Sequence, residues 1–280
     1  MWQLVITTFE MGTLYALVVI STWLTSTLLS YDDLSIEASF GFGGALQARL
    51  LSWGLSPIFS PIFAMIAGIF SGLLTGLLHT FLGLNNLLTG IIMVTAFFSI
   101  NMLVGTINMS VIQYGSIFNF VPTVPQIVSK LPILISAVLI ILTGICWLLT
   151  TQVGFVMRAT GSNPLLVTSI GKSPRRYFII TLILAHSIAA FAGALFVQYT
   201  GYFSLWSSTG ILVAALTGLV IARSLSSRLG IELIIGAYIY QAIIAISLHL
   251  QIPPEWSRFM TASMLVLLMT MQRKSYAQNQ

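Results

Sequence analysis

Three acidic side chains near the start of the chain are of the type that could bind an ion or a polar solute. Glu10 falls a short way inside the first apolar stretch, and Asp33 and Glu37 lie in the glycine-rich segment 31–44. Acidic groups at membrane depth are costly and usually face a cavity or a partner. For Asp33 and Glu37, an ordinary polar loop between two apolar segments is the alternative reading.

Amide side chains accompany a later apolar segment, 84–107. Asn85 and Asn101 could line a route for a zwitterionic solute, or they could form hydrogen bonds between helices. The candidates for a translocation path are therefore Glu10, Asp33, Glu37, Asn85 and Asn101.

The sequence predicts no catalytic, metal or cofactor site. His79, His186 and His249 are far apart, and none has a metal-ligand spacing such as His-x-x-x-His. Neither a nucleophile with its base nor a phosphate-binding glycine loop of the Walker type is visible. We therefore expect a chain that is not an enzyme and that draws energy from an ion gradient or from another subunit. Cys146 lies inside an apolar run without a metal-ligand companion, which predicts a packing residue.

The composition identifies the environment of these residues. Of the 280 residues, 57% are hydrophobic and only 6% are charged, against about 25% charged in an ordinary soluble domain. This balance excludes a soluble enzyme, a nucleic-acid-binding domain and a disordered chain. It also disfavours an outer-membrane barrel, whose strands alternate polar and apolar residues.

Long stretches have no Asp, Glu, Lys or Arg: 50–129, 131–157, 177–222 and 233–254. A membrane-spanning helix needs about 20 mostly apolar residues. We therefore expect one all-α polytopic membrane domain over residues 1–280, with about 8–10 transmembrane helices and a broken, glycine-rich second helix. The expected spans are 4–29, a short one ending near 53, 58–79, 84–107, 131–151, 177–199, 209–222, 230–248 and 254–272.

The longest polar connection is the loop at about 152–176. It contains Arg158, Lys172, Arg175 and Arg176 and no acid, so the preference of basic loops for the cytoplasm places it there. Glycine and proline divide it into two short amphipathic pieces. A loop of this length needs its own structure or a function, and this one could contact anionic lipid or dock a soluble protein.

Small residues recur at helical spacing in two of the expected spans. Gly68, Gly72 and Gly76 fall on one helix face, and Ala189 and Gly193 repeat the pattern later. Such faces let helices approach closely in lipid, so plain helix packing is the favoured interpretation.

Several motifs together resemble a known family. They are Arg-Ala-x-Gly-x-Asn-Pro at 158–164, Ala-Ala-x-Ala-Gly-Ala-Leu at 189–195, the front-end segments 12–17 and 33–40, and the segments 72–80, 87–91 and 99–101. This pattern resembles the permease subunit of bacterial ABC importers of the branched-chain amino acid and ribose type. It is most similar to a subgroup associated with uptake of tryptophan, tyrosine or other amino acids. Ser162 and Leu165 depart from the acidic residues that relatives often have there.

The resemblance implies two permease subunits, identical or sister chains, in the bacterial cytoplasmic membrane. It also implies two cytosolic ABC ATPases that bind the ATP, and an extracytoplasmic solute-binding protein. The basic loop would then be a cytoplasmic coupling loop resting on the ATPase. Its candidate residues are Gly154, Arg158, Ala159, Gly161, Asn163, Pro164, Gly171, Arg175 and Arg176.

We therefore expect a permease that moves a small polar solute, such as an amino acid, inward by ATP-driven alternating access. Two alternatives stay open from the sequence. One is a secondary transporter that uses the acids as proton or sodium sites, and the other is a membrane scaffold that anchors a soluble enzyme.

Overall fold

The computed structural model describes residues 2–120, 130–225, 230–253 and 256–278. Helices make up nearly all of this part of the chain. Their bounds are α1 Trp2–Trp23, α2 Ile36–Ser52, α3 Ser60–Phe81, α4 Asn86–Gly105, α5 Lys130–Thr150, α6 Gln152–Ser162, α7 Pro164–Ser169, α8 Pro174–Thr200, α9 Ile211–Leu225, α10 Ile231–His249 and α11 Ser257–Gln278. Single turns of π-helix (Leu24–Leu28) and 3-10 helix (Ile112–Tyr114, Ile117–Phe120, Leu205–Ser208) complete the helical content.

Seven helical segments in the described residues are long and apolar enough to cross a membrane: Trp2–Leu28, Ser60–Phe81, Asn86–Gly105, Lys130–Thr150, Pro174–Thr200, Leu205–Leu225 and Ile231–His249. Two further expected spans are present as shorter helices. The expected short second span corresponds to α2, a helix of 17 residues, and the last expected span contains the shorter apolar helix Phe259–Thr270 of α11. The expected all-α polytopic fold is confirmed.

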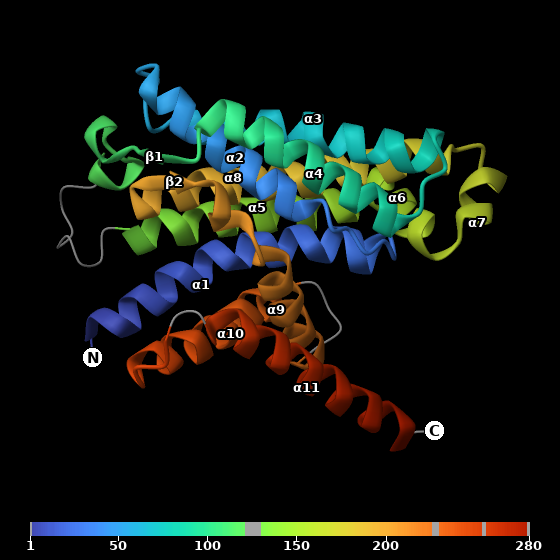
Figure 1. The fold of residues 1–280 in the computed structure, drawn as a ribbon. Coiled ribbons are helices and arrows are strands. Elements are labelled where there is room, and N and C mark those ends of the chain that lie inside the picture. The colour runs from blue at the N-terminus through green and yellow to red at the C-terminus, as the bar shows by residue number, and fades with distance from the viewer. Residues whose placement is uncertain (1, 121–129, 226–229, 254–255, 279–280) are drawn as a thin grey trace.

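The loops gather at two opposite ends of the bundle. One end has α6, α7 and the carboxyl terminus, on the right of Figure 1. The other has the amino terminus and a two-stranded antiparallel ribbon of β1 (Asn108–Ser110) and β2 (Tyr202–Ser204), in which Met109 pairs with Phe203. Arg158, in α6, and Arg175, in the first turn of α8, are exposed and belong to the α6–α7 end.

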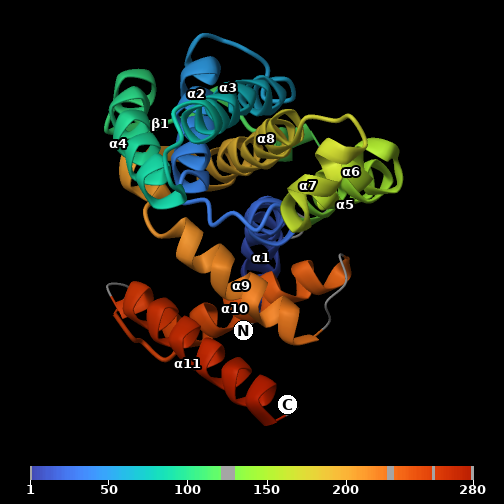
Figure 2. The ribbon, with the colours of Figure 1, turned by 90° about the vertical axis from the view of Figure 1, so that its right-hand side faces the viewer.

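The helices divide into two groups on either side of α1. Figure 2 shows α2, α3, α4 and α8 together on one side and α9, α10 and α11 on the other. Helix α2 packs against α8, α3 and α4, and α1 joins the groups through its contacts with α8, α9 and α10. Most of the buried apolar side chains belong to one cluster centred on α1, with Leu17, Ile20 and Leu24 at most 1% exposed.

The sequence predicts a second helix that is broken within its glycine-rich segment. In the structure the break lies before the glycines, so the predicted position of the break was wrong. Residues 36–52 form one continuous helix that includes Gly41, Gly43 and Gly44. The interruption is the non-helical segment 29–35, in which Ser30 adopts a positive φ of 54°. This segment turns back into the bundle, so α2 begins beside the middle of α8. His186, which contacts Ser39 of α2, is the thirteenth of the 27 residues of α8.

Candidate functional site

A buried carboxylate–imidazole pair lies where α2 begins. Asp33 Oδ2 and His186 Nε2 are 2.9 Å apart, and both side chains are 0% exposed. The other carboxylate oxygen of Asp33 accepts hydrogen bonds from the backbone N–H of Ser35, at 2.8 Å, and from its hydroxyl. An isolated carboxylate would be very costly at this depth, so these partners are what allow Asp33 to be buried.

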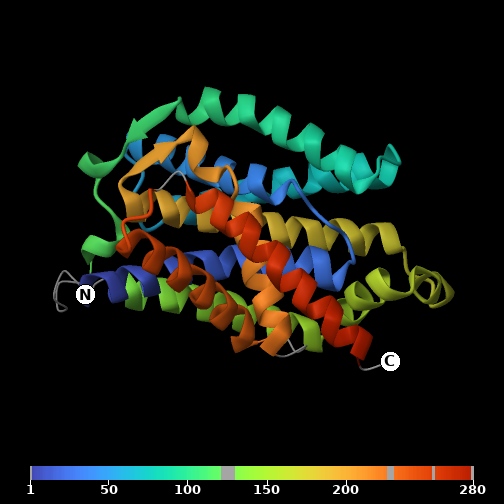
Figure 3. The ribbon, with the colours of Figure 1, turned by 60° about the horizontal axis from the view of Figure 1, so that its bottom comes forward.

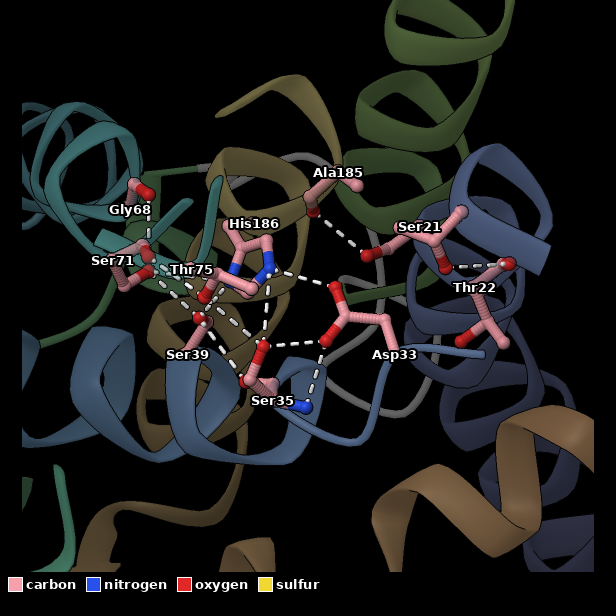
Figure 4. Close-up of polar contacts among 11 residues, drawn as sticks. Ser21, Thr22, Asp33, Ser35, Ser39, Gly68, Ser71, Thr75, Ala185 and His186 are labelled. Carbon is pink, nitrogen blue, oxygen red and sulfur yellow. Dashed lines mark hydrogen bonds and ion pairs between the residues drawn. The ribbon is translucent and has the colours of Figure 1, made fainter. Parts of the chain in front are cut away.

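Hydroxyl groups surround the other side of the imidazole ring (Figure 4). Ser39 Oγ contacts His186 Nδ1 at 2.5 Å and Ser71 Oγ at 2.7 Å. Ser35 Oγ in turn lies 3.1 Å from Thr75 Oγ1. Both ring nitrogens are therefore bonded, and one polar network joins the start of α2 to α3 and α8. Such a network fixes the three helices relative to one another.

The glycines on one face of α3, at positions 68, 72 and 76, let α3 approach α8 closely. The hydroxyl groups of Ser71 and Thr75 therefore lie near His186. A Cβ atom on Gly68 would lie 2.6 Å from the Cα of Ser187, and one on Gly72 would lie 2.7 Å from the Cα of Ile183. The backbones of α3 and α8 thus touch. Helix packing, the favoured interpretation of these glycines, is confirmed.

Helices α2 and α8 approach each other in the same way. A Cβ on Gly43 would collide with the carbonyl group of Ala190, and one on Gly193 would collide with the carbonyl oxygen of Phe40. Side chains larger than hydrogen at Gly43 or Gly193 would force these backbones apart.

The five candidate path residues do not form one cluster. Glu10 is 5% exposed and accepts a hydrogen bond of 2.9 Å from the Tyr199 hydroxyl, which ties α1 to α8. The ammonium group of Lys130 lies 4.4 Å from the centre of the Tyr199 ring and donates to the Tyr199 carbonyl oxygen at 3.2 Å. Glu10 therefore belongs to a cluster of its own, apart from Asp33.

Glu37 and Asn101 both flank the turn that precedes α9. Glu37 Oε2 accepts a hydrogen bond of 3.1 Å from the backbone N–H of Gly210. Asn101 is 4% exposed, and its carbonyl oxygen has no hydrogen-bond partner in the described residues. Its amide nitrogen lies against Gly41, beside the Ser208 hydroxyl.

Asn85 has a structural role at the start of α4. Its side-chain oxygen accepts a hydrogen bond of 2.8 Å from the backbone N–H of Leu88, so it is the N-cap of α4.

The basic loop folds as two helices with ordered ends. Thr151 caps α6, and the side chain of Asn163 accepts from the N–H of Leu166 at 3.1 Å, which caps α7. Pro164 is the first residue of α7, where its missing N–H costs nothing. The two short amphipathic pieces expected from the sequence are present as α6 and α7.

Three contacts attach α6 to the bundle. The Arg158 guanidinium donates to the carbonyl oxygen of Leu149 at 2.7 Å. A Cβ on Gly154 would collide with the carbonyl oxygen of Leu148, and one on Gly161 with that of Leu28. Helix α6 is thus held directly against the ends of α5 and of the first span.

A small apolar cluster joins α6 to α7 and α8. Buried Ala159 and Val156 pack with Val167, which is 0% exposed, and with Tyr177. Gly171, with φ +73°, makes the turn toward α8.

The outer face of this loop is exposed. Leu165 is 79% exposed, and Leu166, Ile170, Arg175 and Arg176 are also exposed. The face therefore offers apolar and basic side chains together.

His186 is a candidate site residue that was not predicted from the sequence. His79 instead stacks on Phe178 with ring centres 4.8 Å apart, and His249 lies at the end of α10. Within the described residues, no three His, Cys, Asp or Glu side chains are placed to hold a metal ion. Cys146 is exposed on α5, so the expectation of a packing residue inside the chain was wrong.

The apolar spans, the polar groups buried between them and the ordered basic loop define a multi-pass helical membrane protein. The family model described as "Branched-chain amino acid transport system / permease component" matches residues 4–269. The chain belongs to this family, and it is an ABC-type permease component for amino acid transport.

Two curated relatives cover almost the whole chain. The tyrosine transport system permease protein of Clostridioides difficile (strain R20291) is 23% identical over 268 residues, which are 94% of this chain and 89% of the relative. The uncharacterized protein RP368 of Rickettsia prowazekii (strain Madrid E) is 24% identical over 264 residues, 90% of this chain and 91% of the relative. No solved structure matches the chain significantly.

Proposed function

We propose that this chain is the transmembrane subunit of an ABC importer that moves an amino acid into the cell. The bundle forms one transmembrane domain, and two copies, or this chain and a sister permease, enclose the route. The chain binds no cofactor and hydrolyses no ATP itself, because a separate cytosolic ATPase does so.

The observation that carries this proposal is the construction of the α6–α7 loop. Capped helix ends, the Arg158 bond to α5 and the glycine contacts make the loop a stiff projection. Its exposed face combines Leu165 with the basic residues Arg175 and Arg176. A stiff projection transmits displacement, so closure of an attached ATPase would move α5, α8 and the first span.

Charge supports the orientation of the bundle. The exposed basic residues of the α6–α7 loop favour the cytoplasmic side of a bacterial inner membrane. The amino terminus and the β1–β2 ribbon then face the other side, where an extracytoplasmic binding protein would deliver the solute.

The relative from C. difficile supports an amino acid with an aromatic ring as the solute, because its name refers to tyrosine transport. A small zwitterion also suits a bundle in which the candidate path residues include both acids and amides.

The test is uptake by the reconstituted complex. The chain would be purified together with a cognate cytosolic ATPase and a solute-binding protein. L-Tyrosine uptake into proteoliposomes would then be measured with ATP on the side of α6 and α7. We expect uptake that requires ATP and the ATPase. Uptake driven by a proton or sodium gradient without the ATPase would overturn the proposal in favour of a secondary transporter, and a complex without any uptake would favour a scaffold.

A further inference from the structure

A cavity of about 360 Å³ lies between α1, α9, α10 and α11. Figure 3 shows α11 crossing in front of α9, with α10 beside it, and the cavity lies where these helices meet α1. Its volume falls at the small end of the range typical of ligand sites, about 300–1,000 Å³. The polar and aromatic side chains that line it are those of Tyr15, Ser207, Thr209, Tyr240, Gln241 and Thr261.

Two aromatic rings form part of the wall. The ring centres of Tyr15 and Tyr240 are 5.6 Å apart at an interplanar angle of 46°. The Tyr240 hydroxyl lies 3.1 Å from Thr261 Oγ1, which fixes the Tyr240 ring between α10 and α11. The cavity can therefore offer a fixed ring edge or face to a planar group.

Several polar groups of the lining are without a hydrogen bond. The Gln241 amide, the Tyr15 hydroxyl and the hydroxyls of Ser207 and Thr209 bond to nothing in the described part of the chain. Polar groups inside a membrane protein are normally bonded to protein or to water. Thr209 is exposed, and none of the four groups is a fully buried atom without a partner. All four residues line one cavity, so their polar groups are accessible there and free to bond a polar occupant.

The charge of the lining restricts that occupant. None of the described residues that line the cavity is Asp, Glu, Lys, Arg or His. A net ion would find no counter-charge at this depth, whereas a zwitterion carries its own. Hydroxyl donors can bond a carboxylate, and the Gln241 carbonyl can accept from an ammonium group.

We propose that this cavity is a substrate subsite for a zwitterionic amino acid with an aromatic side chain. The inference rests on the proposed function and adds where in this chain the solute binds. The α-ammonium and carboxylate groups bond to Gln241 and to the hydroxyls, and the ring packs on Tyr240. None of the five path candidates lines the cavity, although Glu37 adjoins it through its hydrogen bond to Gly210.

The test uses thiol protection in the assembled transporter. The native thiol is removed by Cys146→Ser, on the exposed face of α5, and Gln241→Cys is introduced. The rate of labelling by N-ethylmaleimide is then measured with and without L-tyrosine, with L-valine as a solute that lacks the ring. Tyr202→Cys, at an exposed position of β2, is the matched control.

We expect saturating L-tyrosine to slow labelling of the Gln241→Cys protein at least fivefold, L-valine to slow it less, and neither to affect the control. In parallel, Gln241→Leu should raise the KM for tyrosine uptake about tenfold, as expected for the loss of a hydrogen bond to a charged group, with little change in the rate of ATP hydrolysis.

Absence of labelling, or labelling that L-tyrosine does not slow, would overturn the subsite if the same complex takes up tyrosine with ATP. Failure of ATP-driven tyrosine uptake in the unmodified complex would instead overturn the proposed function. Equal protection by both amino acids would refute the aromatic preference.

Discussion

Asp33 and His186 are 153 positions apart in the sequence, yet their side chains meet at 2.9 Å with neither accessible to solvent. The contact joins the irregular segment before α2 to the middle of α8. The contact lies between segments whose helices, α2 and α8, touch through Gly43 and Gly193.

Removing His186 should therefore destabilise the protein strongly. His186→Ala leaves the Asp33 carboxylate buried with a lost partner, which typically costs about 3–5 kcal/mol. We expect a large fall in the midpoint of thermal unfolding in detergent. Asp32→Asn, at the exposed neighbouring position, is the control and should have almost no effect. An unchanged midpoint for His186→Ala would show that the pair does not stabilise the fold.

The glycines of α3 should tolerate no side chain. Gly72→Ala places a methyl group against the backbone of Leu182 and Ile183 on α8, and we expect lower yield of folded protein and a lower unfolding midpoint. Gly144→Ala is the matched control, because a Cβ there meets nothing within 4 Å. It should be neutral or stabilising by up to about 1 kcal/mol, the difference in helix propensity. Equal effects of the two substitutions would contradict the close approach of α3 and α8.

Loss of the α7 cap should uncouple ATP hydrolysis from uptake. Asn163→Ala removes the bond to Leu166, costs about 1 kcal/mol of helix stability and loosens α7 on the face that would meet the ATPase. We expect reduced uptake with continued hydrolysis in the reconstituted complex.

Asn85→Ala removes the equivalent cap from α4 and should lower stability without uncoupling. Asn163→Asp retains a capping oxygen and should restore uptake. If the two cap deletions behave alike, the effect reports stability rather than coupling.

The link between α6 and α5 can be tested at Arg158. Arg158→Ala removes the hydrogen bond to the Leu149 carbonyl, so a displacement of α6 is transmitted less directly to α5. We expect about a tenfold lower ratio of solute moved to ATP hydrolysed, with normal membrane insertion. Thr143→Ala, at an exposed position of α5 outside the loop, is the control and should leave this ratio unchanged. A normal ratio in Arg158→Ala would show that this bond does not carry the coupling.

The positions of the spans and of the basic loop follow from the sequence, because charge is expensive in a bilayer and its absence marks the apolar segments. The charge-free stretch 131–157 contains most of α5, and the stretch 177–222 contains most of α8 and α9. The capped bend at Asn163 also follows from local residue chemistry, since an amide before proline is a typical helix start.

The pairing of the buried polar groups could not be predicted from the charge pattern of the sequence. Asp33 stood out as an acid at membrane depth, but nothing local connects it to a histidine on α8. A usable signal was that His186 is the one histidine within the charge-free stretch 177–222. A second was the spacing of Ser71 and Thr75, which share a helix face beside the glycines of α3.

Two further differences have separate causes. The glycines at 41, 43 and 44 break helices in water, but here the contacts with α8 compensate for their low helix propensity, and α2 stays continuous. Cys146 lies in an apolar run, but lipid accepts the same residues as a protein core. Composition alone therefore does not distinguish the face of a membrane helix that packs in the bundle from the face that meets lipid.

Because α2, α3 and α8 touch backbone to backbone and share one sealed polar network, sliding any of them past the others would break many contacts at once. We therefore expect α2, α3 and α8 to move together as one rigid body during a transport cycle. The change of shape that admits and releases a solute is then expected outside this block, among the helices that do not share the network.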